Sequence, residues 1–159
     1  MGLVVGLNRM RIVTFRCEDQ LFAADILSVE RVLRNEGVRP IPDMPSWMEG
    51  VIDHDGRVIP VIDMRRRFGL AGVKPGPQSR LLICSGNGVE AALRVDAVLD
   101  VRPVEASDMS DPPALFRGLA GSYLKGLTRR QGQLVVVLDL DRLLATGESL
   151  QLEAGEGAA

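Results

Sequence analysis

Two stretches of the chain repeat one another, and this repeat restricts the folds that the chain can adopt. Residues 50–63 read GVIDHDGRVIPVID and residues 126–139 read GLTRRQGQLVVVLD, so the first glycine, the turn glycine and the last aspartate match at a spacing of 76 residues. Each copy predicts a strand, a glycine turn and an apolar strand. Each closing Asp can accept from the free N–H groups of a short helix that follows. A chance likeness of two hairpins is the alternative.

A weaker match extends the repeat toward the N-terminus. Residues 22–32 align with 91–101 at a spacing of 69, which pairs Val29 with Val98 and Val32 with Val101. The smaller spacing fits a longer connector at 38–46 in the first half. We therefore expect an all-β fold of two similar five-stranded units at about 11–70 and 80–140. Each unit should close into a partly open β-barrel, because small sheets otherwise expose their edges.

Short apolar runs separated by turn residues are typical of strands. Helix is expected only as a turn at 64–69 and as a closing helix at 139–145. A single domain at 11–145 would lie between a flexible N-terminus at 1–10 and a flexible tail at 146–159. The expected strands are 11–16, 21–25, 29–33, 50–54, 57–63, 80–85, 89–95, 98–103, 123–129 and 133–138.

The composition excludes several classes of function. The net charge of −2 lacks the basic surplus of nucleic-acid binders, and an aromatic content of 4% is too low for a base-stacking platform. No window approaches the ~20 apolar residues that cross a bilayer, and residues 1–10 lack the features of a signal peptide. We therefore expect a cytoplasmic protein with no nucleic-acid partner and no direct membrane insertion.

Few residues suggest catalysis. Cys17 and Cys84 lie in apolar runs and are expected to be reduced core thiols. Nothing in the spacing places either thiol beside His54 as a nucleophile and base. The run Asp53-His54-Asp55 is a candidate metal cluster, but strand alternation puts His54 on the face opposite the two aspartates, which favours a solvated turn. No metal and no cofactor are expected.

Two further features of the sequence each allow two interpretations. The run Arg65-Arg66-Arg67 either binds phosphate or an acidic partner, or forms a solvated helix face whose stems cover apolar surface. Trp47 lies on a proline-rich connector, where it either plugs the end of a barrel or contacts a partner.

The order of several motifs resembles the CheW-like family of chemotaxis coupling proteins. VTF at 13–15, FAADILSV at 22–29, PIPDMPSWMEGVI at 40–52 and RVIPVIDMRRRFG at 57–69 are similar to the first half of that family. ALRVDAVLDV at 92–101, YLKG at 123–126 and VVLDLDRLL at 136–144 are similar to its second half. Each motif is modest alone, but together they cover about 11–145 in the family's order and spacing.

The resemblance implies two five-stranded barrels around a shared apolar core, and a non-enzymatic adaptor recruited to membrane-associated receptor arrays. One surface would dock the regulatory domain of a CheA-type histidine kinase, and another the cytoplasmic tip of a methyl-accepting chemoreceptor, with head-to-tail contacts building the arrays. Exposed Val and Gly would form a shallow apolar seat for a helix. Carried over by position, the receptor-binding residues are Val29, Arg31, Glu49, Gly50, Val51, Asp55 and Val101. The kinase-binding residues are Ile41, Asp43, Val58, Ile59 and Val61.

Two charges depart from the family pattern. The usual Asn-Leu-Arg-Gly hairpin is here 53–56, so that Asp55 replaces an arginine, and Arg31 replaces an acidic residue. Such charge reversals either change which partner the surface binds or remove one of the two partner contacts, since specificity is often built by repulsion. The alternative function is a divergent, uncoupled module that binds only the receptor or only the kinase. From another class, the alternative is a small β-barrel enzyme or ligand-binding protein.

Overall fold

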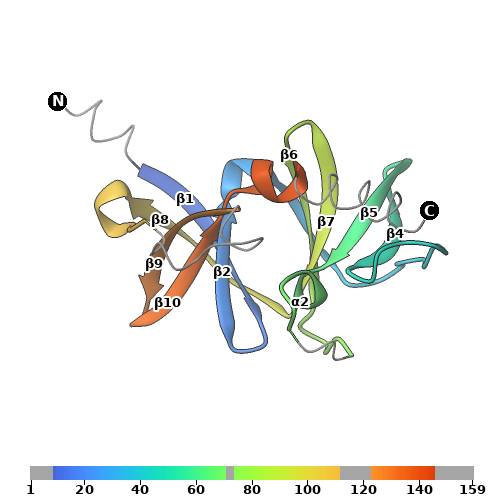
Figure 1. Cartoon of the computed structure of the whole chain (residues 1–159), viewed down its shortest axis with the longest axis horizontal. Coiled ribbons are helices and arrows are strands. Elements are labelled where there is room, and N and C mark those ends of the chain that lie inside the picture. The colour runs from blue at the N-terminus through green and yellow to red at the C-terminus, as the bar shows by residue number, and fades with distance from the viewer. Residues whose placement is uncertain (1–8, 71–73, 112–122, 146–159) are drawn as a thin grey trace.

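Two five-stranded β-sheets lie beside one another in the chain (Figure 1). The computed structural model describes residues 9–70, 74–111 and 123–145. Sheet A contains, in spatial order, β8 (Ala97–Glu105), β1 (Arg9–Cys17), β2 (Gln20–Asp25), β10 (Gln133–Leu138) and β9 (Leu124–Arg130). Sheet B contains β3 (Val29–Arg34), β6 (Arg80–Gly86), β7 (Val89–Val95), β5 (Arg57–Asp63) and β4 (Met48–His54).

The expected all-β class is confirmed, and all ten expected strands are present with only small differences at their ends. β1 begins at Arg9, so the expected flexible N-terminus at 1–10 is too long; residues 1–8 and the tail at 146–159 lie outside the described residues. The short helices are η1 (Ile26–Ser28), α2 (Met64–Arg67), η2 (Ala106–Asp108) and residues 140–145. Within the described part of the chain, no helix combines the length and the apolar character needed to cross a membrane.

The strand order reproduces the repeat seen in the sequence. Replacing each strand of sheet A by the strand five places away along the chain turns its order into that of sheet B. The aspartates that end the two copies also act alike. Asp63 accepts from the Arg65 backbone N–H at 3.0 Å, and Asp139 accepts from the Arg142 N–H at 3.2 Å. Each therefore caps a helix as expected.

The two sheets do not follow the two halves of the sequence. β1 and β2 lie in sheet A with the last three strands, whereas β3 to β7 form sheet B. The β units expected at 11–70 and 80–140 thus exchange strands, through parallel pairs between β10 and β2 and between β5 and β7. A self-match along the sequence identifies equivalent strands, but it does not show which sheet each strand joins.

Backbone ladders do not close either sheet within the described residues, so the expected barrels are seen only as curled five-stranded sheets. Side chains link distant strands instead. In sheet A, Arg102 on edge strand β8 donates from Nη2 to the carbonyl oxygen of Arg129 on edge strand β9 at 2.7 Å. In sheet B, Arg57 on β5 reaches Glu30 on β3 at 3.2 Å. The two sheets therefore curl enough to bring separated strands within side-chain reach.

Three apolar clusters hold the fold together. The largest lies between the sheets and takes buried side chains from both, including Phe15, Phe22, Leu82 and Leu93. A second cluster belongs to sheet A and a third to sheet B. Burying one side chain of this size stabilises the folded state by about 1.5–3 kcal/mol. The central cluster therefore fixes how the two sheets pack.

Candidate functional site

Most of the predicted receptor-binding residues lie on the two edge strands of sheet B. Edge strands expose unpaired backbone groups, which makes them natural contact surfaces. Val101 lies instead on edge strand β8 of sheet A and is 45% exposed. On sheet B, β3 carries Val29 and Arg31, β4 carries Glu49, Gly50 and Val51, and the turn between β4 and β5 carries Asp55.

An ion cluster joins β3 to the beginning of β5. Arg57 contacts Glu30 through Nη2 at 3.2 Å and Glu90 on β7 through Nη1 at 2.8 Å. The hydrogen bond to Glu30 raises the pKa of the Arg57 guanidinium. Exposed pairs of this kind are individually weak, but this one spans three strands. The sequence analysis missed the cluster, because these residues are neighbours only once β3, β5 and β7 share a sheet.

Arg31 and Asp55, the two charges expected to depart from the family pattern, are both exposed. The side chain of Arg31 makes no ion pair or hydrogen bond within the described residues. The Asp55 carboxylate lies 3.5 Å from Nε2 of His54. His54 is buried while Asp53 is exposed, so strand alternation holds, but the expected solvated turn is wrong for His54. The charges of Arg31 and Asp55 are therefore available to a partner.

A buried ion network lies beneath β4. Arg94 on β7 is 6% exposed; its Nε lies 2.8 Å from the Glu49 carboxylate, and its Nη2 donates to Asp63 at 2.5 Å. Burial raises the pKa of Glu49, and the attraction of Arg94 opposes that rise. The network ties β4, β5 and β7 together at the edge where Glu49, Gly50 and Val51 were predicted to meet the receptor.

The backbone of the connector between β3 and β4 passes close to Gly50 on β4. An added Cβ would lie 2.1 Å from the carbonyl oxygen of Arg39, on the connector between β3 and β4. Next to it, Arg39 and Val51 exchange two backbone hydrogen bonds, at 2.8 and 2.9 Å. A side chain at position 50 would push this connector away. The glycine therefore has a structural role, whether or not a receptor contacts it.

The predicted kinase-binding residues divide into exposed and buried groups. Ile41 is 40% exposed, Asp43 is exposed, and Val58 is 70% exposed. Ile59 and Val61 are buried in the apolar cluster of sheet B, so the prediction that they contact a partner is wrong for the folded chain. Alternation explains the division, because Ile59 and Val61 point to the inner face of β5 and Val58 to the outer face.

Exposed apolar side chains recur at equivalent positions of the repeat. Val58 on β5 corresponds to Leu134 on β10, which is 43% exposed. Val32 on β3 is 44% exposed and corresponds to Val101 on β8. Leu27, in η1, is 89% exposed, and the sequence analysis missed it. Both sheets thus carry exposed apolar side chains that a partner could contact.

The arginine run and Trp47 have structural partners. Arg67 is 8% exposed, with its guanidinium 5.2 Å from the Trp47 ring centre and 5.1 Å from that of Tyr123. Arg65 lies 2.6 Å from Asp96. Trp47 is half-buried and packs against the central cluster. These contacts favour Trp47 as a plug, and they show that the expected solvated helix face is wrong for Arg65 and Arg67, whereas the Arg66 side chain is 55% exposed.

The two cysteines are free and buried, as expected. Burial raises the pKa of Cys17 and of Cys84 to about 12, so both thiols are protonated at neutral pH and are poor nucleophiles. Within the described residues, no group of three or more His, Cys, Asp or Glu side chains could hold a metal ion.

Comparison with known proteins relates this fold to one family. Residues 11–148 match the family model described as "CheW-like domain". Chemotaxis protein CheW of Treponema pallidum (strain Nichols) is 27% identical, over 94% of this chain and 91% of its own length. Protein FrzA of Myxococcus xanthus is 31% identical over 83% of each chain.

A solved structure agrees with the family match. The crystal structure of scaffolding protein TtCheW from Thermoanaerobacter tengcongensis superposes with a TM-score of 0.75 and 29% sequence identity, covering 81% of this chain and 88% of that one. The family match spans β2 to β10 and nearly all of β1. On these matches, the chain belongs to the CheW-like family.

Proposed function

We propose that the chain is a non-enzymatic adaptor that couples a chemoreceptor to a CheA-type histidine kinase. Relatives named chemotaxis protein CheW and a neighbour titled scaffolding protein support a scaffold role in chemotaxis. The observation that carries the proposal is that exposed apolar side chains lie on two separate parts of the surface, at Val58 on β5 and at Val101 on β8. A coupling protein needs separate surfaces of this kind for two partners.

We assign the partners to separate parts of sheet B. Val58, with Ile41 and Asp43 on the connector, faces the regulatory domain of the kinase. The edge strands β3 and β4, with Val29, Arg31, Glu49, Gly50, Val51 and Asp55, face the cytoplasmic tip of the receptor, together with Val101 on sheet A. Such an adaptor would act in the cytoplasm, at receptor arrays.

The first test mixes the chain with the regulatory domain of each CheA-like kinase and the tip fragment of each chemoreceptor of its own organism. Pull-downs and calorimetry measure each pairwise affinity, and phosphotransfer assays measure the kinase rate. Binding to both partners, with a kinase rate that changes only when all three are present, is the result expected of a coupling adaptor. Binding to one partner with no effect on the kinase would overturn coupling and favour an uncoupled module.

Val58→Arg should weaken binding of the kinase regulatory domain by about tenfold or more, because it places a hydrated charge at the centre of an apolar contact. The change should leave the unfolding midpoint nearly unaltered, since Val58 is 70% exposed. Calorimetry measures the affinity. Leu134→Arg is the matched control at the equivalent position of sheet A. Equal losses of affinity for both variants would contradict the assignment of the kinase to sheet B.

An atypical partner is favoured by one observation, the pair of exposed charges Arg31 and Asp55. The double variant Arg31→Glu with Asp55→Arg should bind the receptor or kinase of the chain's own organism about tenfold more weakly, because like charges at an interface are costly. Lys125→Glu, an exposed charge change on β9, serves as control. If every partner affinity stayed the same in the double variant, the two charges would have no part in specificity.

A further inference from the structure

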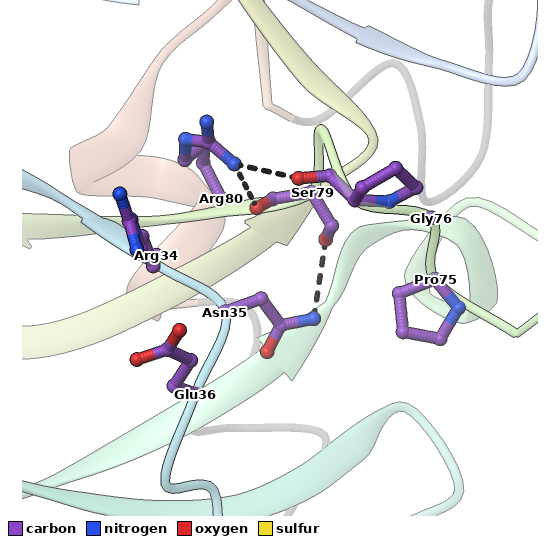
Figure 2. A pocket seen from close by; sticks show the side chains of 8 residues that line it. Arg34, Asn35, Glu36, Pro75, Gly76, Ser79 and Arg80 are labelled. Carbon is purple, nitrogen blue, oxygen red and sulfur yellow. Dashed lines mark hydrogen bonds between the residues drawn. The ribbon is translucent and has the colours of Figure 1, made fainter.

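A polar pocket of about 440 Å³ lies where β3 ends and β6 begins (Figure 2). Arg34, Asn35 and Glu36 line it from the β3 side, and Ser79, Arg80 and the segment at 75–77 line it from the β6 side. The predicted partner-binding residues on β3, Val29 and Arg31, lie nearer the other end of that strand. This pocket therefore needs an explanation of its own.

Arg34 and Arg80 face each other directly in the antiparallel ladder between β3 and β6. Like charges at directly opposed positions destabilise a sheet. Neither guanidinium is paired with a carboxylate within the described residues. Figure 2 shows both arginine side chains on the same side of the pocket, above Asn35 and Glu36 in that view. Two neighbouring positive charges, neither of them in an ion pair in the described part of the chain, favour an anionic ligand.

The arginine of β6 is already held in place for such a ligand. Arg80 donates from Nη1 to the carbonyl oxygens of Ser79 at 2.8 Å and Pro77 at 3.1 Å. These two bonds leave its Nε and Nη2 without an acceptor among the described residues. A guanidinium fixed before binding loses less conformational entropy when the ligand arrives. The remaining donors of Arg80 and the whole fork of Arg34 can therefore bind the same group.

The floor of the pocket is also fixed. Ser79 is 3% exposed; its hydroxyl donates to the carbonyl oxygen of Val95 at 2.8 Å and accepts from Nδ2 of Asn35 at 3.1 Å. This chain of hydrogen bonds ties the end of β3 to the beginning of β6. Glu36 is the one carboxylate in the lining, and its negative charge opposes an anion. Removing the positive charge of Arg34 or Arg80 should therefore weaken the binding of an anion, and removing the negative charge of Glu36 should strengthen it.

We propose that this pocket binds a phosphate group, either as inorganic phosphate or as the monoester of a small molecule. A guanidinium fork matches the geometry of phosphate oxygens, and two forks together match its double charge. The site differs from the arginine run at 65–67, the only phosphate candidate of the sequence analysis. Its ligand binding does not depend on the adaptor function, because it uses none of the residues assigned to the kinase or the receptor.

The test is calorimetric titration of inorganic phosphate into the full chain at about pH 8, where phosphate is mostly dianionic, with chloride as the background salt. Arg34→Gln and Arg80→Gln should each weaken binding about tenfold, since each removes a charge-assisted contact. Glu36→Gln should tighten binding, because it removes the opposing charge. Arg11→Gln, on β1 of sheet A, is the matched control and should bind as the unchanged chain does.

A second measurement uses thermal unfolding, and it remains informative if Arg80→Gln folds poorly. Arg34→Glu should raise the unfolding midpoint without phosphate, because an ion pair replaces a like-charge pair, and it should abolish the stabilisation by added phosphate. Glycerol 3-phosphate in place of phosphate distinguishes the sources, because tighter binding of the ester identifies a phosphomonoester ligand. Absence of saturable binding to both probes, or equal affinity in all arginine variants, would overturn the proposal.

Discussion

Gly50→Ala is expected to lower the free energy of unfolding by about 3 kcal/mol, at the upper end of the usual range for overpacked sites. The new Cβ would lie 2.1 Å from the Arg39 carbonyl oxygen, a backbone atom that cannot turn aside as a side chain can. The connector would have to move, and the two hydrogen bonds between Arg39 and Val51 would be lost. Urea denaturation followed by far-ultraviolet circular dichroism measures the change.

The repeat supplies the matched control, Gly126→Ala, at the equivalent position of sheet A. There the new Cβ would meet the methyl end of Met109 at 2.6 Å and the carbonyl oxygen of Ser110 at 3.1 Å. Because a methionine side chain can adopt another rotamer, we expect a loss of only about 1 kcal/mol. Equal losses in the two variants would show that the close approach to Arg39 is not what requires glycine at position 50.

The same comparison shows what the sequence could predict of the fold. Positions 50 and 126 are both glycine because each lies beside a backbone segment that pairs with the strand through an isolated antiparallel bridge, at Arg39 and at Ser110, so the repeat carried real structural information. The exchange of strands between the two sheets has no comparable signal in the sequence. β2 pairs with β1 of its own half on one side and with β10 of the other half on the other side, and a pairing over that second distance has no local signal.

The candidate surfaces could be predicted only in part, for a similar reason. The apolar run at 58–62 has no polar residue to mark an outer face, yet Val58 points to solvent while Ile59 and Val61 are buried. Which face is covered depends on the sheet's neighbours, and periodicity alone cannot decide it. The pairing of Arg34 with Arg80 depends on the register of β3 against β6, which has no local signal in the sequence.

Arg94→Met should have the other large effect. We expect it to lower the free energy of unfolding by about 3–5 kcal/mol at about pH 8, because it removes one partner of a buried ion pair. Asp63 would stay buried without the guanidinium that now contacts it, and Glu49 would lose its partner at 2.8 Å. Arg66→Gln is the matched control. Arg66 also contacts Asp63, at 3.4 Å, but its side chain is 55% exposed, so we expect a loss below about 1 kcal/mol.

The pH dependence separates lost charge from lost packing in this variant. Burial already raises the pKa of Glu49, and without the opposing attraction of Arg94 that pKa rises further. A carboxyl whose pKa is raised in the folded state stabilises that state at low pH, and this contribution is lost as the pH rises through the folded pKa. The deficit of Arg94→Met should therefore be smallest near pH 4, close to the unfolded pKa of about 4.3, and should grow toward about pH 8. Urea denaturation at both pH values measures it, and a deficit that is the same at both would mean that Arg94 stabilises β4 through packing of its stem, with its charge contributing little.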